Sequence, residues 1–278
     1  MQLKVLEAKD DFVRFLLEDT SPAFANALRR VLISDVPKMA IEDVEFHLGP
    51  IRAEDGKEYE SVSPLFDEII AHRLGLLPIP TDPTLYNPRP SCPSCHGEGC
   101  PSCTIIYSLN KRGPTTVTSG DLEPIGDEKL RIKDPNIPIV KLGEGQAMLV
   151  YATAVLGTGR DHAKWQATHG VSYRYYPTVK AGSKAMDPLS PDVPYCSSHM
   201  ETTAMEEQSL ELSSDCAACK TFRDAYKVDA VKAGNDPSRI LMSFETDGSL
   251  TAPEVLRKAF EILAARFSDL SGQADALA

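Results

Sequence analysis

Four cysteines between Cys92 and Cys103 constrain the fold of this chain more than any other feature of its sequence. They form two Cys-x2-Cys pairs around a Gly-Glu-Gly segment, in the run CPSCHGEGCPSC. Each pair directs two thiolates at one ion, and the glycines let the backbone reverse tightly, so that all four thiolates can meet tetrahedrally. Because four thiolates leave no open coordination position, the run favours a structural zinc ion over a catalytic one.

The short gap between the two pairs keeps two other states of these cysteines open. An iron–sulfur cluster can be held by the same four thiolates, and free surface thiols would hold nothing. His96 lies inside the run and is expected to be a bystander. The chain has seven cysteines, and an odd number disfavours a complete disulfide framework. In a reducing cytosol thiols stay reduced, so clustered cysteines favour metal ligation over disulfides.

Three further cysteines far downstream, Cys196, Cys216 and Cys219, form an incomplete cluster motif. Bacterial ferredoxins repeat the Cys-x2-Cys spacing once more, but the matching position here is Phe222. Three thiolates could hold a three-iron cluster, a labile four-iron cluster with a foreign ligand such as His199 or Asp215, or nothing. The residues alone leave these three outcomes open.

The charge balance limits the partners of the chain. With 29 Lys and Arg against 40 Asp and Glu, the formal net charge is -11, so the chain is not expected to bind nucleic acid by itself. Hydrophobic residues make up 42% of its 278 residues, which suits a globular protein of about two domains. No apolar stretch reaches the roughly 20 residues of a spanning helix, and residues 1–11 lack a signal-peptide core, so a cytoplasmic location is predicted.

Regular elements are predicted most clearly near the two ends of the chain. Residues 1–18 alternate apolar and polar side chains around a Lys-Asp-Asp turn, which predicts two strands, and a helix should run from Pro22 until Pro37 ends it. Residues 239–246 predict a C-terminal strand. Thr251-Ala-Pro-Glu254 has capping-box spacing and opens a helix whose apolar surface is wider than one core face requires. Residues 181–215 have few large apolar side chains, which predicts a long loop or a small metal-supported subdomain.

No catalytic constellation is found in the sequence. It contains no Walker loop, zincin helix or nucleophile elbow, and Gly157-Thr-Gly159 lacks the third glycine of a dinucleotide loop. The polar and aromatic residues that follow, with Trp165 as an anchor, suit a contact loop better than an active site. The chain is therefore predicted not to be an enzyme on its own.

Four blocks of sequence, in order along the chain, resemble the alpha-type subunits of RNA polymerase. They are FANALRRVL at 24–32, DEIIAHRLGLLPI at 67–79, AVLGTGRDHAKWQ at 154–166, and FETDGSL at 244–250 with the helix after it. Together the blocks span most of the chain. The branch of the family that the chain resembles most is the archaeal one, whose members are related to the third-largest subunit of eukaryotic polymerase II and to the bacterial alpha N-terminal domain.

The resemblance implies an α+β fold in three parts. A discontinuous dimerisation domain, made of a sheet plus two helices, would take residues 1–47 and 227–278. A mainly β insertion domain with the Cys-rich metal loop would take residues 48–178. A small ferredoxin-like subdomain would take residues 179–226.

The resemblance also implies a function in transcription. Alpha-type subunits are non-catalytic assembly platforms of DNA-directed RNA polymerase, a nucleotidyltransferase complex whose activity belongs to the whole assembly. The chain would form a heterodimer with subunit L, join subunits N and P, and receive the second-largest catalytic subunit, with no direct contact to nucleic acid or membrane. The interface with subunit L would contain Phe24, Leu28, Val31, Phe260, Leu263 and Phe267. Contacts to the large subunit would come from Asn26, Arg29, Arg30, His162, Lys164 and Trp165.

The resemblance bears on the metals as well. Eukaryotic relatives carry a zinc loop where Cys92 to Cys103 falls, which favours zinc there, whereas cluster-binding archaeal members have a fourth cysteine where this chain has Phe222. The cysteines, taken alone, also suggest two other functions. The first run is similar to the zinc motif of J-protein co-chaperones, which suggests a zinc-dependent chaperone. The downstream set suggests a stand-alone iron–sulfur electron-transfer protein.

Overall fold

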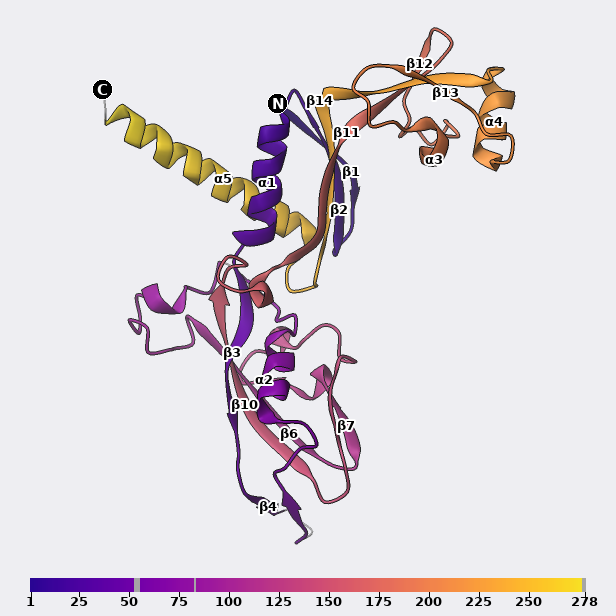
Figure 1. Cartoon of the computed structure of the whole chain (residues 1–278). Coiled ribbons are helices and arrows are strands. Elements are labelled where there is room, and N and C mark those ends of the chain that lie inside the picture. The colour runs from indigo at the N-terminus through magenta and orange to yellow at the C-terminus, as the bar shows by residue number, and fades with distance from the viewer. Residues whose placement is uncertain (53–55, 83, 277–278) are drawn as a thin grey trace. The chain divides into compact units, whose positions relative to one another are not determined.

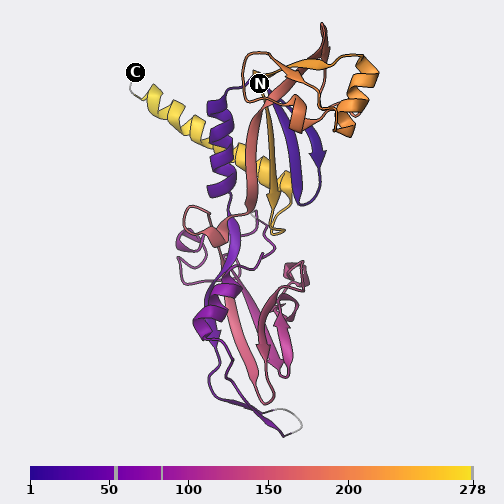
Figure 2. The same cartoon turned by 45° about the vertical axis from the view of Figure 1, so that its right-hand side comes forward.

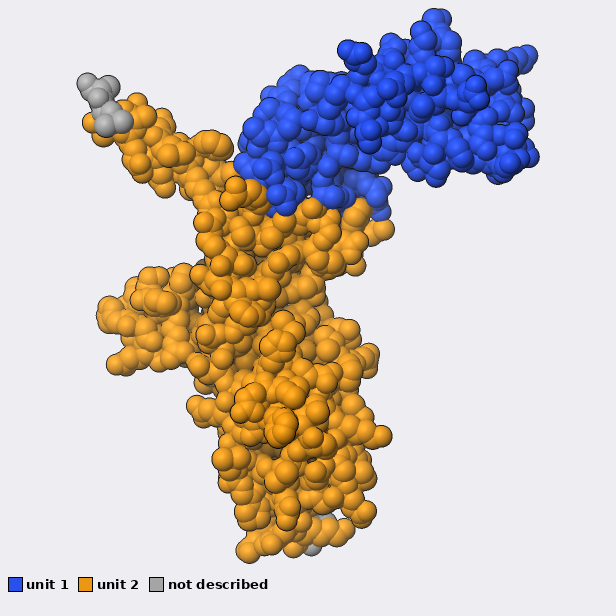
Figure 3. Space-filling model, viewed as in Figure 1, with its two compact units in different colours: residues 1–7, 13–29, 172–243 blue, residues 8–12, 30–171, 244–278 orange. Residues whose placement is uncertain are grey.

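The computed structural model describes residues 1–52, 56–82 and 84–276 and has a mixed α+β architecture. It divides into two compact units, each built from separate stretches of the chain (Figure 3). Unit 1 comprises residues 1–7, 13–29 and 172–243, and unit 2 comprises residues 8–12, 30–171 and 244–278.

Unit 1 contains most of a six-stranded sheet. Five strands follow the order β1 (Gln2–Ala8), β2 (Phe12–Glu18), β14 (Ala230–Thr246), β11 (Thr168–Ala181) and β12 (Lys184–Met186), and β13 (Gln208–Glu211) pairs with β14. The two N-terminal strands predicted from alternation are confirmed. The predicted C-terminal strand is present but longer than residues 239–246, because its first residues, from Ala230, pair with β13.

The N-terminal helix α1 (Pro22–Ser34) begins where it was predicted. The Oγ of Ser21 accepts a hydrogen bond from the backbone N–H of Phe24 at 3.4 Å, which satisfies one of the free donors of the first turn. Pro22 starts the helix, where its missing N–H costs nothing. The helix ends before Pro37, as predicted.

Unit 2 is built around a four-stranded sheet in the order β3 (Lys38–Phe46), β10 (Ala147–Gly157), β6 (Thr104–Arg112) and β8 (Glu123–Pro124). The central strand β10 pairs antiparallel with both β3 and β6. Helix α2 (Asp67–Gly75) lies against β3, and the buried core between them includes Ile41 and Leu74 (Figure 2).

Shorter elements complete unit 2. Two ribbons pair β4 (Pro50–Arg52) with β5 (Glu58–Glu60) and β7 (Thr115–Thr118) with β9 (Pro138–Leu142). Single 3-10 turns are η1 (Arg89–Ser91), η2 (Ser119–Asp121), η3 (Glu128–Leu130) and η4 (Ala163–Trp165). The first and last of these turns flank the two loops on which the candidate site is built.

The C-terminal helix α5 (Ala252–Asp275) has a buried first half and an exposed second half. The predicted capping box is present, with the backbone N–H of Thr251 donating to Oε2 of Glu254 at 2.9 Å. The buried residues of the helix end at Leu263, and residues 264–276 are all exposed. Phe267 and Leu270 are among the large apolar side chains left in solvent.

A small subdomain is inserted between β11 and β14 (Figure 1). It contains β12, α3 (Ser197–Met200), β13 and α4 (Ala217–Tyr226). Its buried core consists of Val179, Ala181, Met200, Leu212, Cys219, Phe222, Val231 and Ala233. Residues 181–215 are therefore part of a packed subdomain and not a featureless loop. Within the described ranges, no helix is long and apolar enough to cross a membrane.

Candidate metal centres and contact loop

The first cysteine run folds back on itself so that its four sulfur atoms converge. The Sγ–Sγ distances are 3.7 Å for Cys92 and Cys100, 3.5 Å for Cys95 and Cys103, and 3.8 Å for Cys100 and Cys103. All four sulfurs lie within 4.8 Å of one another. A tetrahedral ion with Zn–S bonds of about 2.3 Å would hold its sulfurs about 3.8 Å apart. The four thiols therefore have the spacing required to bind one metal ion.

Positive backbone φ angles between the two cysteine pairs produce the reversal. His96, Gly97 and Gly99 have φ angles of 52°, 101° and 105°, in the region that favours glycine. This confirms the role predicted for the glycines. The converging donor set in the described structure contains the four thiols and not the imidazole of His96.

Backbone N–H groups point at the sulfurs of this loop. The N–H of Gly99 lies 3.3 Å from Sγ of Cys95, and that of Cys100 lies 3.3 Å from Sγ of Cys103. Desolvation raises the pKa of the Cys95 thiol, but hydrogen bonds from Gly99 and Gly97 outweigh it and lower that pKa to about 6. Burial raises the pKa of Cys103 to about 12. A bound cation would favour the thiolate form of both.

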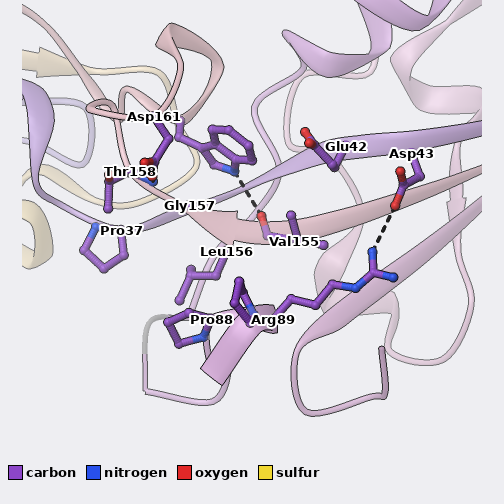
Figure 4. A pocket seen from close by; sticks show the side chains of 12 residues that line it. Pro37, Glu42, Asp43, Pro88, Arg89, Val155, Leu156, Gly157, Thr158 and Asp161 are labelled. Atoms are coloured by element: carbon purple, nitrogen blue, oxygen red, sulfur yellow. Dashed lines mark hydrogen bonds and ion pairs between the residues drawn. The ribbon is translucent and has the colours of Figure 1, made fainter. Parts of the chain in front are cut away.

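Arg89 ties the metal loop to the sheet of unit 2. Its Nε donates to the carbonyl oxygen of Gly97 at 3.1 Å, and its Nη2 donates to that of Glu98 at 3.3 Å. Its Nη1 donates to Oδ2 of Asp43 on β3 at 3.0 Å (Figure 4). The guanidinium thus satisfies two acceptors that the reversal leaves free. The sequence did not single out Arg89, because only the folded chain brings Asp43 beside it.

A second set of donors converges in the subdomain of unit 1, where α3 and α4 begin. The Sγ of Cys196 lies 3.3 Å from Nδ1 of His199 and 3.6 Å from Sγ of Cys216. With Cys219, all four donor atoms lie within 4.8 Å of one another, so this group could also hold a metal ion. The structure thus brings the three predicted cysteines together and adds His199, whereas Asp215 is not a member of the group.

The thiols of this second group differ in their surroundings. A hydrogen bond from the backbone N–H of Cys219, followed by the thiol of Cys196, lowers the pKa of Cys216 to about 6. Burial raises the pKa of Cys219 to about 11. Phe222, at the position where a ferredoxin motif would continue, is fully buried and packs on Tyr226 with a distance of 4.6 Å between ring centroids.

The predicted contact loop anchors itself on the sheet of unit 2. The indole Nε1 of Trp165 donates to the carbonyl oxygen of Val155 at 3.1 Å (Figure 4). The Nζ of Lys164 lies 4.4 Å from the centre of the Trp165 ring and donates to the carbonyl oxygen of Ile41 at 3.0 Å. Trp165 is buried and His162 is exposed. The loop is therefore held rigidly by Trp165 and Lys164, and it leaves His162 in solvent.

An open pocket of about 520 Å³ lies beside this loop. Its wall includes Pro37, Asp43, Arg89, Leu156 and Trp165 (Figure 4). Because Arg89 also holds the first metal loop, the pocket brings the metal loop and the contact loop to one surface of unit 2.

Asp35, just after α1, is the centre of an ion-pair network that the sequence did not reveal. Its side chain is 6% exposed and accepts hydrogen bonds of 2.7 Å from both Arg160 and Arg266. Burial raises the pKa of this carboxyl, but the two guanidinium groups outweigh burial and hold the pKa below its ordinary value of 3.8. The network joins the contact loop, which carries Arg160, to α5, which carries Arg266.

The six residues predicted for a partner interface differ in exposure. Leu28, Val31 and Leu263 are buried within the chain, Phe24 and Phe260 are half-buried, and Phe267 is exposed. An aspartate at Leu263 would therefore disturb the interior of the chain itself. Phe267 and its neighbour Leu270 are the positions where a substitution can be tested without that effect.

The predicted large-subunit contacts on α1 lie on its more polar side. Nη2 of Arg29 donates to Oδ1 of Asn26 at 2.9 Å, one turn apart on the helix. Both side chains are half-buried, and Arg30 is exposed. The pair presents a pre-formed polar group, and Arg30 remains available to a partner.

Residues 14–267 match the family described as the RNA polymerase Rpb3/Rpb11 dimerisation domain. The chain is 43% identical over 270 residues to the DNA-directed RNA polymerase subunit Rpo3 of Thermoplasma volcanium, a match that covers 97% of this chain and 98% of that relative. Subunits of the same name are similar in Picrophilus torridus, at 44% over 270 residues covering 96% and 97%, and in Pyrococcus furiosus, at 32% over 271 residues covering 95% and 93%.

Proposed function

Because the chain belongs to the family of the RNA polymerase Rpb3/Rpb11 dimerisation domain, we propose that it is the assembly platform of an archaeal DNA-dependent RNA polymerase. It is a non-catalytic subunit, as its relatives are. In this role it pairs with subunit L, is joined by subunits N and P, and receives the second-largest catalytic subunit. A cytoplasmic location belongs to this role. The chaperone and electron-transfer alternatives have no support among these relatives.

The exposed second half of α5 is the observation that carries the dimerisation proposal. Phe267 and Leu270 are 56% and 60% exposed on a helix whose first half is buried. Helix residues three apart lie on one face, so these two side chains form a single apolar spot. Such a spot at the end of a domain named for dimerisation suits an alpha-type partner, which would cover it together with the half-buried Phe260.

The first metal loop has a structural role in this proposal. The ion is zinc, since four converging thiolates with tetrahedral spacing and no open position match a structural zinc site. The ion would hold the reversal of the loop, and Arg89 would fix the loop on β3. A zinc-held loop is a rigid edge for another subunit to contact.

The contact loop supplies the surface for a large subunit. Trp165 and Lys164 hold the loop in place, which leaves His162 and the adjoining pocket for a partner side chain. Asn26, Arg29 and Arg30 provide the corresponding polar contacts from α1. The charge of -11 suits a platform that binds proteins and not the DNA.

The three-part organisation belongs to the same proposal. Residues 1–47 and 227–278 form the dimerisation domain, residues 48–178 the insertion domain, and residues 179–226 a ferredoxin-like subdomain. The insertion of a small, separately packed subdomain between β11 and β14 supports the third part. The boundaries of the other two parts lie near strands that belong to both, since β3 pairs with β10 and β11 lies in the six-stranded sheet.

Co-expression with subunit L tests the proposal. The full chain should co-purify with subunit L as a 1:1 complex, whereas a chain that ends at residue 266 should not. The truncated chain keeps every buried residue of α5 and the ion pair of Arg266 with Asp35, so its circular dichroism and thermal unfolding should show a folded protein. Equal yields of complex from both chains would count against α5 as the interface, and no complex from either would count against the role.

A further inference from the structure

We propose that Cys196, His199, Cys216 and Cys219 form a second structural zinc site, of the Cys3His type, in the subdomain of unit 1. The four residues are spaced as Cys-x2-His and Cys-x2-Cys, the arrangement of two short knuckles that face one ion. With the first run, this site would use all seven cysteines of the chain, none of which forms a disulfide.

The geometry is that of a single ion. A tetrahedral zinc would hold two sulfurs about 3.8 Å apart, and a sulfur and an imidazole nitrogen about 3.6 Å apart. The structure has 3.6 Å between the sulfurs of Cys196 and Cys216, and 3.3 Å between Sγ of Cys196 and Nδ1 of His199. As in the first metal loop, all four donor atoms lie within 4.8 Å of one another.

An iron–sulfur cluster does not suit the same donors. In a four-iron cluster each thiolate binds a different iron, so the body of the cluster must fit between the sulfurs. Sulfurs in near contact leave no room for it. The chain also lacks a fourth thiolate here, because the position where a ferredoxin motif would continue is Phe222. The Phe222 side chain is fully buried in the core of the subdomain. The fourth donor that the structure supplies is an imidazole, a normal zinc ligand.

The helices of the subdomain are short, so a bound ion would add to the stability of its fold. Helix α3 has four residues and α4 has ten, both too short to be stable alone. The buried core beneath them has eight residues, of which Ala181 and Ala233 are small and Cys219 is one of the proposed ligands. An ion bound by Cys196 and His199 on one side and by Cys216 and Cys219 on the other would join the starts of the two helices. Zinc binding would then stabilise the fold of the subdomain directly.

Metal analysis of the full chain, purified anaerobically, tests the site. The wild type should contain two zinc ions per chain and no iron or acid-labile sulfide. X-ray absorption at the zinc edge should give seven sulfurs and one nitrogen for every two zinc ions. Iron with stoichiometric sulfide, or a single zinc bound by sulfur alone, would overturn the proposal.

Three variants assign the second ion to its ligands. His199→Ala should weaken the second zinc by more than about 100-fold in a chelator competition and leave the first zinc bound. His199→Cys should keep two zinc ions with all-sulfur ligation, which separates loss of a ligand from loss of folding. Asp215→Asn is the matched control and should keep two zinc ions with unchanged affinity. Retention of both ions at wild-type affinity in His199→Ala would overturn the assignment of the imidazole.

These measurements use the chain without any partner. Their failure would leave the proposed role in polymerase assembly intact, and failure of the heterodimer test would leave the zinc count unaffected.

Discussion

Replacing Phe267 by alanine perturbs the exposed half of α5 without touching the interior of the chain. The side chain is 56% exposed, and it lies beyond Leu263, the last buried residue of the helix. Alanine is the best helix former, so the helix should persist. The melting temperature of the isolated chain should therefore change by no more than about 1 °C, since surface substitutions of this kind are close to neutral.

The expected loss of affinity follows from the exposed area. A Phe side chain presents about 200 Å², of which a little over half, about 110 Å², remains for a partner to cover. At about 25 cal/mol per Å², covering it contributes nearly 3 kcal/mol, or about 100-fold in the dissociation constant. Because binding does not recover all of the buried area as affinity, we expect a weakening between about tenfold and 100-fold.

Isothermal titration calorimetry with purified subunit L measures this loss. Phe66→Ala is the matched control, because Phe66 is another exposed phenylalanine, at 77%, on a different part of unit 2. It should bind subunit L within about twofold of the wild type. A dissociation constant of Phe267→Ala within about twofold of the wild type would refute the reasoning, as would a large fall in the stability of the isolated variant.

Three further substitutions test other parts of the structure. Asp35→Asn should lower the free energy of unfolding by about 2 kcal/mol at pH 7. Because the folded-state pKa of Asp35 is depressed, this contribution exists above the ordinary pKa of 3.8 and is lost as the pH falls through the folded value, so the difference in stability between variant and wild type should shrink as the pH falls below 3.8. A difference that stays constant as the pH is lowered below 3.8 would contradict the ion-pair account. Arg89→Ala should speed release of zinc from the first site to a chelator by about tenfold, as loss of a supporting contact does, and an unchanged rate would show that the loop does not depend on Arg89. Gly157→Ala should displace the sole tryptophan, since a Cβ there would lie 2.5 Å from the Trp165 ring; its fluorescence should shift to the red and stability should fall by about 1–3 kcal/mol, and an unshifted spectrum would refute the packing argument.

The local features of this chain could be predicted from sequence because their causes are local. Ser21 and Pro22 start α1, and the Thr251 and Glu254 pair starts α5, since capping depends on residues within one turn. The convergence of the four thiols in the first metal loop could be predicted from the spacing of the two Cys-x2-Cys pairs and from Gly97 and Gly99 between them. In each case the residues that act together lie within a few positions of one another.

The features that escaped prediction depend on contacts between distant segments. Asp35 meets Arg160 and Arg266 across more than 100 positions, and no spacing rule connects them. Helical periodicity identified the apolar face of α5, but it could not tell that Leu263 is buried in the chain itself while Phe267 is left exposed. The sequence offers His199 and Asp215 equally as a foreign ligand, and only the folded subdomain places Nδ1 of His199 beside the cysteines.

Omit-one reconstitution of the polymerase tests the central claim, that this chain is a non-catalytic assembly platform, most directly. The subunits are purified separately and mixed with and without the chain, and native mass spectrometry and nucleotide incorporation are measured on each mixture. We predict no incorporation by the chain alone, full assembly and activity when it is present, and no entry of the second-largest subunit into a complex with subunits L, N and P when it is absent. An active assembly of otherwise normal composition formed without the chain would contradict the claim.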